Sequence, residues 1–145
     1  MLATTDLEAF ADLSPDGRWL AYVSNESGPL KMLMKPYPGQ ERGVPVSQGG
    51  GTNPRWSHDG RRLFYWSDNK AILPVHFIRG ELMVVDLEFQ PSRVTVSSPI
   101  ALFTANMPSF FSYSSYYDVS PVEDRFVVVE ETKRPGATHF NVVLN

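Results

Sequence analysis

Three consecutive residues, Ser57, His58 and Asp59, carry the side-chain types of a hydrolase triad. In such a triad the histidine takes the proton of the serine hydroxyl while the carboxylate orients the imidazole. That relay is built from distant segments, whereas the side chains of consecutive residues in a tight turn diverge. The sequence also contains no Gly-x-Ser-x-Gly elbow. We therefore expect no catalytic residue here and interpret the three as turn residues.

The three histidines, His58, His76 and His139, stand singly, without a partner two or four residues away. A zinc site needs several nitrogen or sulfur ligands together, and cysteine is absent from the chain. We therefore expect the histidines to occupy surface or core positions. The sequence indicates no metal site and no cofactor.

Three aspartates, Asp16, Asp59 and Asp124, recur at similar places in the chain. A carboxylate in a turn accepts hydrogen bonds from nearby backbone N–H groups. Calcium ligation is the alternative, but a calcium loop needs several oxygen ligands close together. Structural use in turns is therefore favoured.

An aromatic-rich stretch between residues 110 and 117 is the best candidate for an interaction surface. Tyrosine beside serine is a composition that binding loops favour, because the rings give a large contact area at little entropic cost. The alternative is that these rings fill the space between packed sheets, and the residues do not decide between the two. The candidates are Phe110, Phe111, Tyr113, Tyr116 and Tyr117.

The chain repeats one phrase, a short turn followed by an apolar strand, in residues 13–24, 56–67 and, more loosely, 119–129. The serines that open the three turns are 43 and 63 residues apart. Repeats of roughly 40–50 residues that each hold several strands are typical of propeller blades. The sequence thus predicts an all-β fold of about three four-stranded β-propeller blades, a partial propeller.

The first copy explains the turn physically. Pro15 fixes φ at one central position, Asp16 favours the next, and Gly17 can adopt the positive φ that closes the hairpin. The third copy has Asp124 where glycine stands and reads as one residue longer. We therefore expect the third turn to be longer and differently shaped.

The strands after the second and third turns, Leu63–Trp66 and Phe126–Val129, are apolar on both faces. A strand covered on both sides has this pattern, as in a sheet between two neighbouring blades. The only helical spacing, Leu7–Leu13, is short, so the chain is expected to be nearly all β. Further predicted strands are Leu30–Lys35, Val44–Ser47, Ala71–Ile78, Gly80–Leu87, Arg93–Val96, Ile100–Phe103 and His139–Leu144.

The length of 145 residues suits a single domain spanning 1–145. Its blade units are expected at approximately 10–52, 53–105 and 113–145. The three tryptophans lie in or beside strands and are expected in the core.

The repeated phrase in residues 13–18 resembles the TolB-type, WD-like β-propeller repeat. Other segments resemble the C-terminal propeller region of bacterial serine/threonine kinase-associated sensor proteins. The resemblance implies a propeller that serves as a binding platform. Kinase signatures are missing, so no phosphorylating activity is expected. The segments concerned are residues 23–28, 35–39, 49–57, 117–121 and 141–145.

The charge balance limits the classes of partner that the chain is expected to bind. There are 13 Lys and Arg against 16 Asp and Glu, for a net charge of −3. A surface for nucleic acid or anionic membrane needs a concentrated basic patch, so neither partner is expected. Residues 1–8 show no signal-peptide pattern and the apolar runs are short, so a soluble protein is expected, in the cytoplasm or the periplasm.

Three blades are fewer than the four to eight that close a propeller. An arc of three leaves two terminal faces, each expected to be apolar, and at least one unpaired strand edge. We therefore expect self-association, most simply a homodimer that forms a six-bladed ring, or a protein partner. The expected function is a non-enzymatic binding module. The alternative is an accessory propeller or remnant of a hydrolase-type or peptidase-type enzyme whose catalytic domain is absent.

Overall fold

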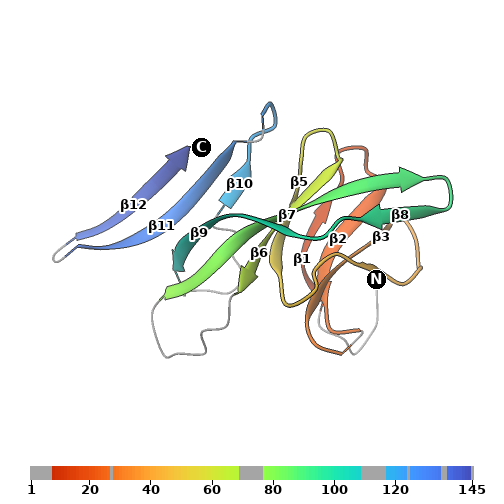
Figure 1. Ribbon diagram of the computed structural model, residues 1–145, viewed down its shortest axis with the longest axis horizontal. Helices are drawn as coiled ribbons and strands as arrows, with labels where there is room; N and C mark the ends of the chain where they lie inside the picture. Colours follow the sequence, from red (N-terminus) through yellow and green to blue (C-terminus); the bar gives the residue numbers. More distant parts are fainter. Residues whose placement is uncertain are drawn as a thin grey trace.

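The structure is a computed structural model that describes residues 8–26, 28–68, 77–108, 117–123, 125–134 and 137–144. The described residues form twelve β-strands, β1 to β12, in three antiparallel sheets (Figure 1). Within these ranges there is no helix, and so none long and apolar enough to cross a bilayer. The predicted all-β class is confirmed.

The first sheet is a four-stranded meander in the order β1-β2-β3-β4. Its strands are β1 (Glu8–Leu13), β2 (Trp19–Ser24), β3 (Lys31–Pro36) and β4 (Val44–Pro45). The predicted short strand at Val44 lies at the sheet edge, where the missing N–H of Pro45 breaks no ladder. The stretch with helical spacing in the sequence, Leu7–Leu13, forms no helix over residues 8–13, because these residues form β1 and pair with β2.

The second sheet is built around one long strand, β7, which pairs with β6 along one edge. Along its other edge run first β8 and then β9, so the outermost strand of this sheet is broken in two at residues 97–99. The sheet is thus a meander with an interrupted last strand. Its strands are β5 (Thr52–Trp56), β6 (Arg62–Asp68), β7 (Phe77–Gln90), β8 (Arg93–Val96) and β9 (Ile100–Pro108).

Strand β7 runs unbroken through Gly80, where the sequence predicted a boundary between two strands. That prediction is wrong, and the packing explains why. A Cβ on Gly80 would lie 2.1 Å from Nε1 of Trp66. The glycine therefore makes room for an indole ring rather than ending a strand.

The third sheet has the order β10-β11-β12, formed by β10 (Tyr117–Val119), β11 (Phe126–Arg134) and β12 (Ala137–Leu144). It holds three strands among the described residues, one fewer than the four expected of a blade.

The second sheet lies between the other two, with the first sheet to the right and the third to the left (Figure 1). Leu63 and Tyr65 on β6 pack with Ala21 of the first sheet. Phe64 on the opposite face of β6 stacks edge-on against Phe126 of the third sheet, with ring centroids 4.9 Å apart. The prediction that this strand is covered on both faces is confirmed.

The three repeated turns have equal length. Leu13 pairs with Leu20, Trp56 with Leu63 and Val119 with Phe126, each seven residues on. The expectation of a longer third turn is therefore wrong. In the sequence the third turn reads as one residue longer because Arg125 is matched to Arg18. Arg125 stands five residues after its serine, whereas Arg18 stands four residues after Ser14.

Candidate functional site

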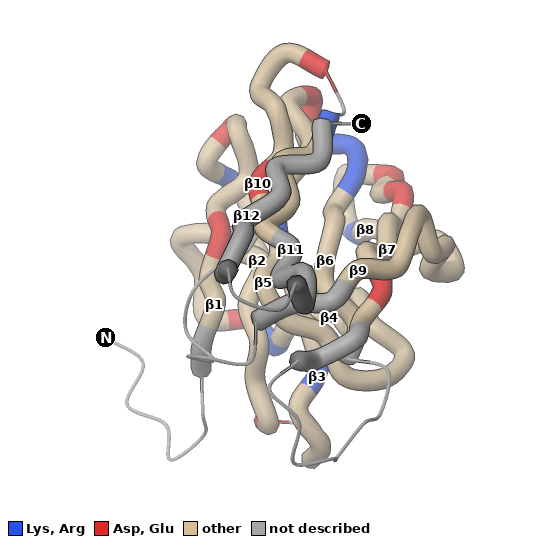
Figure 2. Tube along the Cα trace, turned by 90° about the vertical axis from the view of Figure 1, so that its left-hand side faces the viewer, with Lys and Arg blue, Asp and Glu red and all other residues tan. Residues whose placement is uncertain are grey.

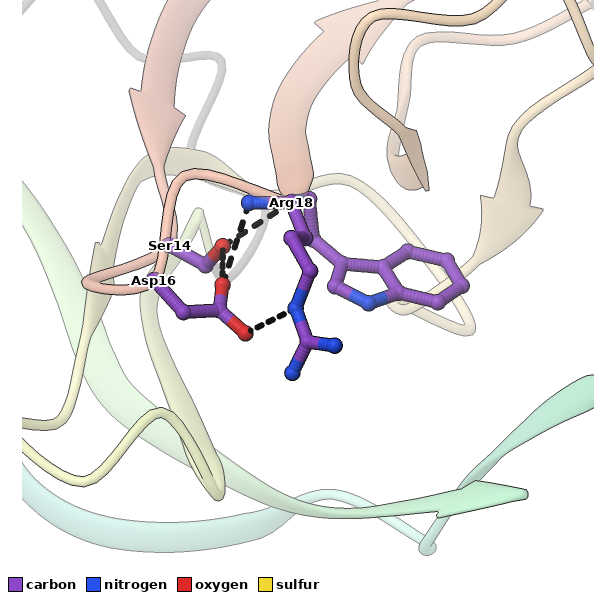
Figure 3. A network of polar contacts seen from close by, with 4 residues as sticks. Ser14, Asp16 and Arg18 are labelled. Atoms are coloured by element: carbon purple, nitrogen blue, oxygen red, sulfur yellow. Dashed lines mark hydrogen bonds and ion pairs between the residues drawn. The ribbon is translucent and has the colours of Figure 1, made fainter. Parts of the chain in front are cut away.

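The first turn is held by a compact polar network (Figure 3). The Ser14 hydroxyl donates to Oδ1 of Asp16 over 2.6 Å, and the backbone N–H and Nε of Arg18 donate to the same carboxylate over 3.1 and 2.7 Å. The Trp19 N–H in turn donates to Oγ of Ser14 over 2.9 Å. These hydrogen bonds, that from Ser14 foremost, lower the pKa of Asp16 to about 2.

The second turn repeats this network with the triad-like residues. The Ser57 hydroxyl donates to Oδ1 of Asp59 over 2.7 Å, and the Arg62 N–H donates to Oγ of Ser57 over 2.9 Å. His58 is exposed. The assignment of Ser57, His58 and Asp59 to a turn is confirmed, and the serine hydroxyl is committed to the aspartate that shapes the hairpin.

Several predicted positions lie outside the described residues: His76, Asp124, Phe110, Phe111, Tyr113 and Tyr116. Of the remaining histidines, His139 belongs to β12, opposite Thr132 of β11. In the part of the chain that is described, no three His, Asp or Glu side chains group closely enough to hold a metal ion.

Tyr117 is the one member of the aromatic stretch whose place is known. Its side chain is 3% exposed, and its hydroxyl donates to the carbonyl of Asn53 on β5. Burial raises the pKa of Tyr117 well above its ordinary value. At this position the ring fills the space between the second and third sheets, so Tyr117 does not offer a surface to solvent.

A row of charges runs across the three sheets at one repeat position. Asp12, Arg55 and Asp118 each stand two residues before the serine that opens a turn. They lie on β1, β5 and β10, the first strand of each sheet, and β5 contacts both of the others. We call these three residues the charged row.

Two members of the charged row, Asp12 and Arg55, reach toward the next sheet. The Asp12 carboxylate accepts a hydrogen bond from the Trp56 N–H over 3.3 Å, and the Asp12 carbonyl accepts one from Nε1 of Trp56 over 3.2 Å. Nε of Arg55 lies 3.6 Å from Oδ1 of Asp118. Partial burial raises the pKa of Asp12, while the Arg55 charge opposes that rise.

The sequence interpretation missed the charged row. Its members differ in sign, so they do not recur as one residue type, and the signal was only their common distance from the turn serine. The strands carrying Asp12 and Arg55 also share a bulge, at Phe10 and Asn53, and both of those residues have φ of 52°. The repeat therefore extends further toward the N-terminal side of the turn than its identical residues indicate.

The two outer faces of the stack differ. On the face of the first sheet turned away from the second, Tyr22, Leu33 and Lys35 are buried. Gly43 lies against Tyr22 and Leu33, and the Glu26 carboxylate accepts hydrogen bonds from the Tyr22 hydroxyl and the Gly43 N–H, over 3.3 and 3.4 Å. Nζ of Lys35 stands 4.7 Å above the Tyr22 ring. We call this part of the first sheet the closed face.

The outer face of the third sheet is open. Val127 is 38% exposed and Val129 half-buried, whereas Phe126 and Val128 on the other side of β11 are buried against the second sheet. Asp118, which pairs with Val127, is 78% exposed. We call the side of the third sheet that bears Val127, Val129 and Asp118 the open face.

Of the two terminal faces expected to be apolar, the third sheet exposes Val127 and half-buries Val129 beside Asp118, and the first is covered in part by its own chain. Acidic and basic residues are interspersed along the described trace (Figure 2). Comparison of the chain with protein-family models and with curated proteins finds no match. The geometry of the open face and the charged row is therefore the basis for the functional inference.

Proposed function

We propose that the chain is a section of a TolB-type β-propeller, three blades long, that acts as a non-enzymatic binding module. It completes its ring with a second copy of itself. The observation that carries the proposal is the open face of the third sheet, which stands where the fold elsewhere places another sheet.

Repeat-equivalent residues support this reading. Ala21, Phe64 and Val127 each stand seven residues after the serine that opens their turn. Ala21 is covered by the second sheet and Phe64 by the third. Val127 alone has no following sheet among the described residues. A stack of this kind continues until its last face is covered, and an arc of three sheets needs a partner for that.

The contacts of the polar residues favour a binding module over an enzyme accessory. Ser57 is bound to Asp59, and Asp12 and Arg55 engage the neighbouring sheet. These side chains therefore have structural partners within the chain. An accessory propeller of a hydrolase would instead be favoured by polar side chains converging on a central pocket.

The mass of the protein in solution tests the proposal. Light scattering behind size-exclusion chromatography should give about twice the 16.3 kDa of one chain at high concentration, falling toward one chain on dilution. Val127→Lys should favour the monomer without loss of the fold, because the ammonium group makes covering this face costly. The matched control is Val122→Lys, at a turn position that is 81% exposed. A monomer at every concentration would refute self-association.

A further inference from the structure

Repeat equivalence also indicates how two copies meet, an inference that rests on the proposed function. At both seams between sheets within the chain, the same two positions of the following sheet face the preceding one. These are Trp56 and Leu63 at the first seam, and Val119 and Phe126 at the second. The equivalent pair in the first sheet is Leu13 and Leu20.

Leu13 and Leu20 have no preceding sheet to face among the described residues. Leu13 is 43% exposed and Leu20 is half-buried, although Trp56 and Leu63 at the equivalent positions are 7% and 0% exposed. The closed face reaches this end of the sheet at Lys35, which pairs with Leu20, and Tyr22 lies further from the turn. Next to its repeated turn, the first sheet is therefore only partly covered at its apolar residues Leu13 and Leu20.

The open face offers the complementary half of such a seam. Its apolar residues, Val127 and Val129, are equivalent to Ala21 and Val23, which are buried residues of the first sheet. Asp118 is equivalent to Asp12, whose carboxylate accepts the N–H of Trp56 from the next sheet. Both halves of a repeat seam, one at each end of the arc, are thus present and at least partly exposed on one chain.

We infer that the open face of one copy, Asp118 with Val127 and Val129, receives Leu13 and Leu20 of a second copy, with Asp118 taking the role of Asp12. The contact is head-to-tail and is made twice in a two-fold ring. Because Tyr22 and Leu33 are already covered by their own chain, each seam is confined to the end of the sheet next to the turn. Small seams of this kind give a dimer that dissociates on dilution.

The chain contains no cysteine, so single engineered thiols report contacts between copies without background. L13C and D118C are made as separate variants, both at exposed positions, and are mixed before mild oxidation. A disulfide forms only where the two Cα atoms come within about 7 Å. The products are separated under non-reducing conditions and identified by mass spectrometry.

The expected product is a mixed L13C–D118C dimer, at least about tenfold more abundant than in a control mixture of S92C with D118C, since Ser92 lies at the distant tip of the β7–β8 hairpin. Efficient dimerisation of D118C alone would overturn the inference in favour of face-to-face pairing of open faces. A wild-type dimer without the mixed disulfide would overturn the seam and leave self-association standing. A wild-type monomer at all concentrations would overturn both.

Discussion

The first and third sheets share a repeat but end the stack in different ways. The first sheet covers much of its outer face with its own loop, which places Gly43 against Tyr22 and Leu33. The third sheet, with three described strands, leaves Val127 exposed on its own outer face, which is the opposite side of the repeat unit. The same hairpin unit can thus serve as a terminus or as a docking surface, depending on whether a loop returns over it.

The polar networks of the two sheets differ as well. In the first turn Ser14 is buried and links Asp16 to the Trp19 N–H. In the third turn Ser120 is half-buried and accepts from the Val122 N–H over 3.3 Å. The third sheet therefore combines an open face with a less tightly bonded turn, and both differences can be tested by matched substitutions.

The largest expected effect contrasts a covered position with its open equivalent. Phe64→Ala should lower the free energy of unfolding by about 3–5 kcal/mol, because the ring is buried between the second and third sheets. Val127→Ala should cost less than about 1 kcal/mol in the dilute monomer, since its side chain is already partly in water. Urea unfolding of both variants measures the difference. Equal costs would show that Val127 is covered within one chain.

The next effect tests how the first sheet is closed. Gly43→Ala should destabilise the fold by about 1–3 kcal/mol, because the added Cβ would lie 2.6 Å from Oη of Tyr22 and 2.7 Å from Cβ of Leu33. Gly50→Ala is the control, as nothing lies within 4 Å of its added Cβ. Thermal unfolding of the two variants gives the comparison. If the loop that carries Gly43 did not pack on the closed face, the two substitutions would have the same effect on stability.

The sequence predicted the parts of this fold that depend on local chemistry. The Asp-Gly turns at Gly17 and Gly60 need positive φ, and these glycines have φ of 71° and 69°. The strand that follows Gly60, β6, is apolar on both faces because a sheet covers each side. The turn glycine and the apolar strand pattern each occupy a few consecutive residues, so both can be recognised in a single sequence.

The features that failed prediction depend on contacts between distant segments. In the sequence Gly80 indicates a strand boundary, whereas in the structure the Trp66 ring packs against its backbone and the strand continues. The closed face depends on Glu26 and Gly43, which are far apart in sequence and carry no shared motif. The charged row was not predicted because Arg55 and its two aspartate equivalents share a position in the repeat but differ in the sign of their charge.

A smaller effect separates the two turns. Ser14→Ala should cost about 1–2 kcal/mol, because it leaves the partly buried Trp19 N–H without the hydroxyl that it now binds. Ser120→Ala should cost no more than about 0.5 kcal/mol, since it removes one long hydrogen bond near solvent. Chemical denaturation with the two variants measured side by side provides the test. A larger loss for Ser120 would mean that the third turn is the better bonded of the two.

The smallest effect is a pH dependence with opposite signs at Asp16 and Asp12. The pKa of Asp16 is about 2 in the folded chain, below its ordinary 3.8, so its ionised form stabilises the fold above pH 3.8. That contribution should be lost as the pH falls from about 4 to about 2. Because the Asp16 side chain is 46% exposed, we expect well under about 1 kcal/mol.

The pKa of Asp12 is instead raised by burial, so its ionisation costs stability, and that cost should be relieved as the pH falls through the raised value. The difference in unfolding free energy between wild type and Asp16→Asn should therefore shrink on acidification. Over the same titration, wild type should gain stability relative to Asp12→Asn. Urea unfolding from about pH 6 down to about pH 2 follows both differences through the carboxyl range. If acidification changed the stability of wild type in the same direction relative to both variants, the pKa of Asp12 would not be raised by burial.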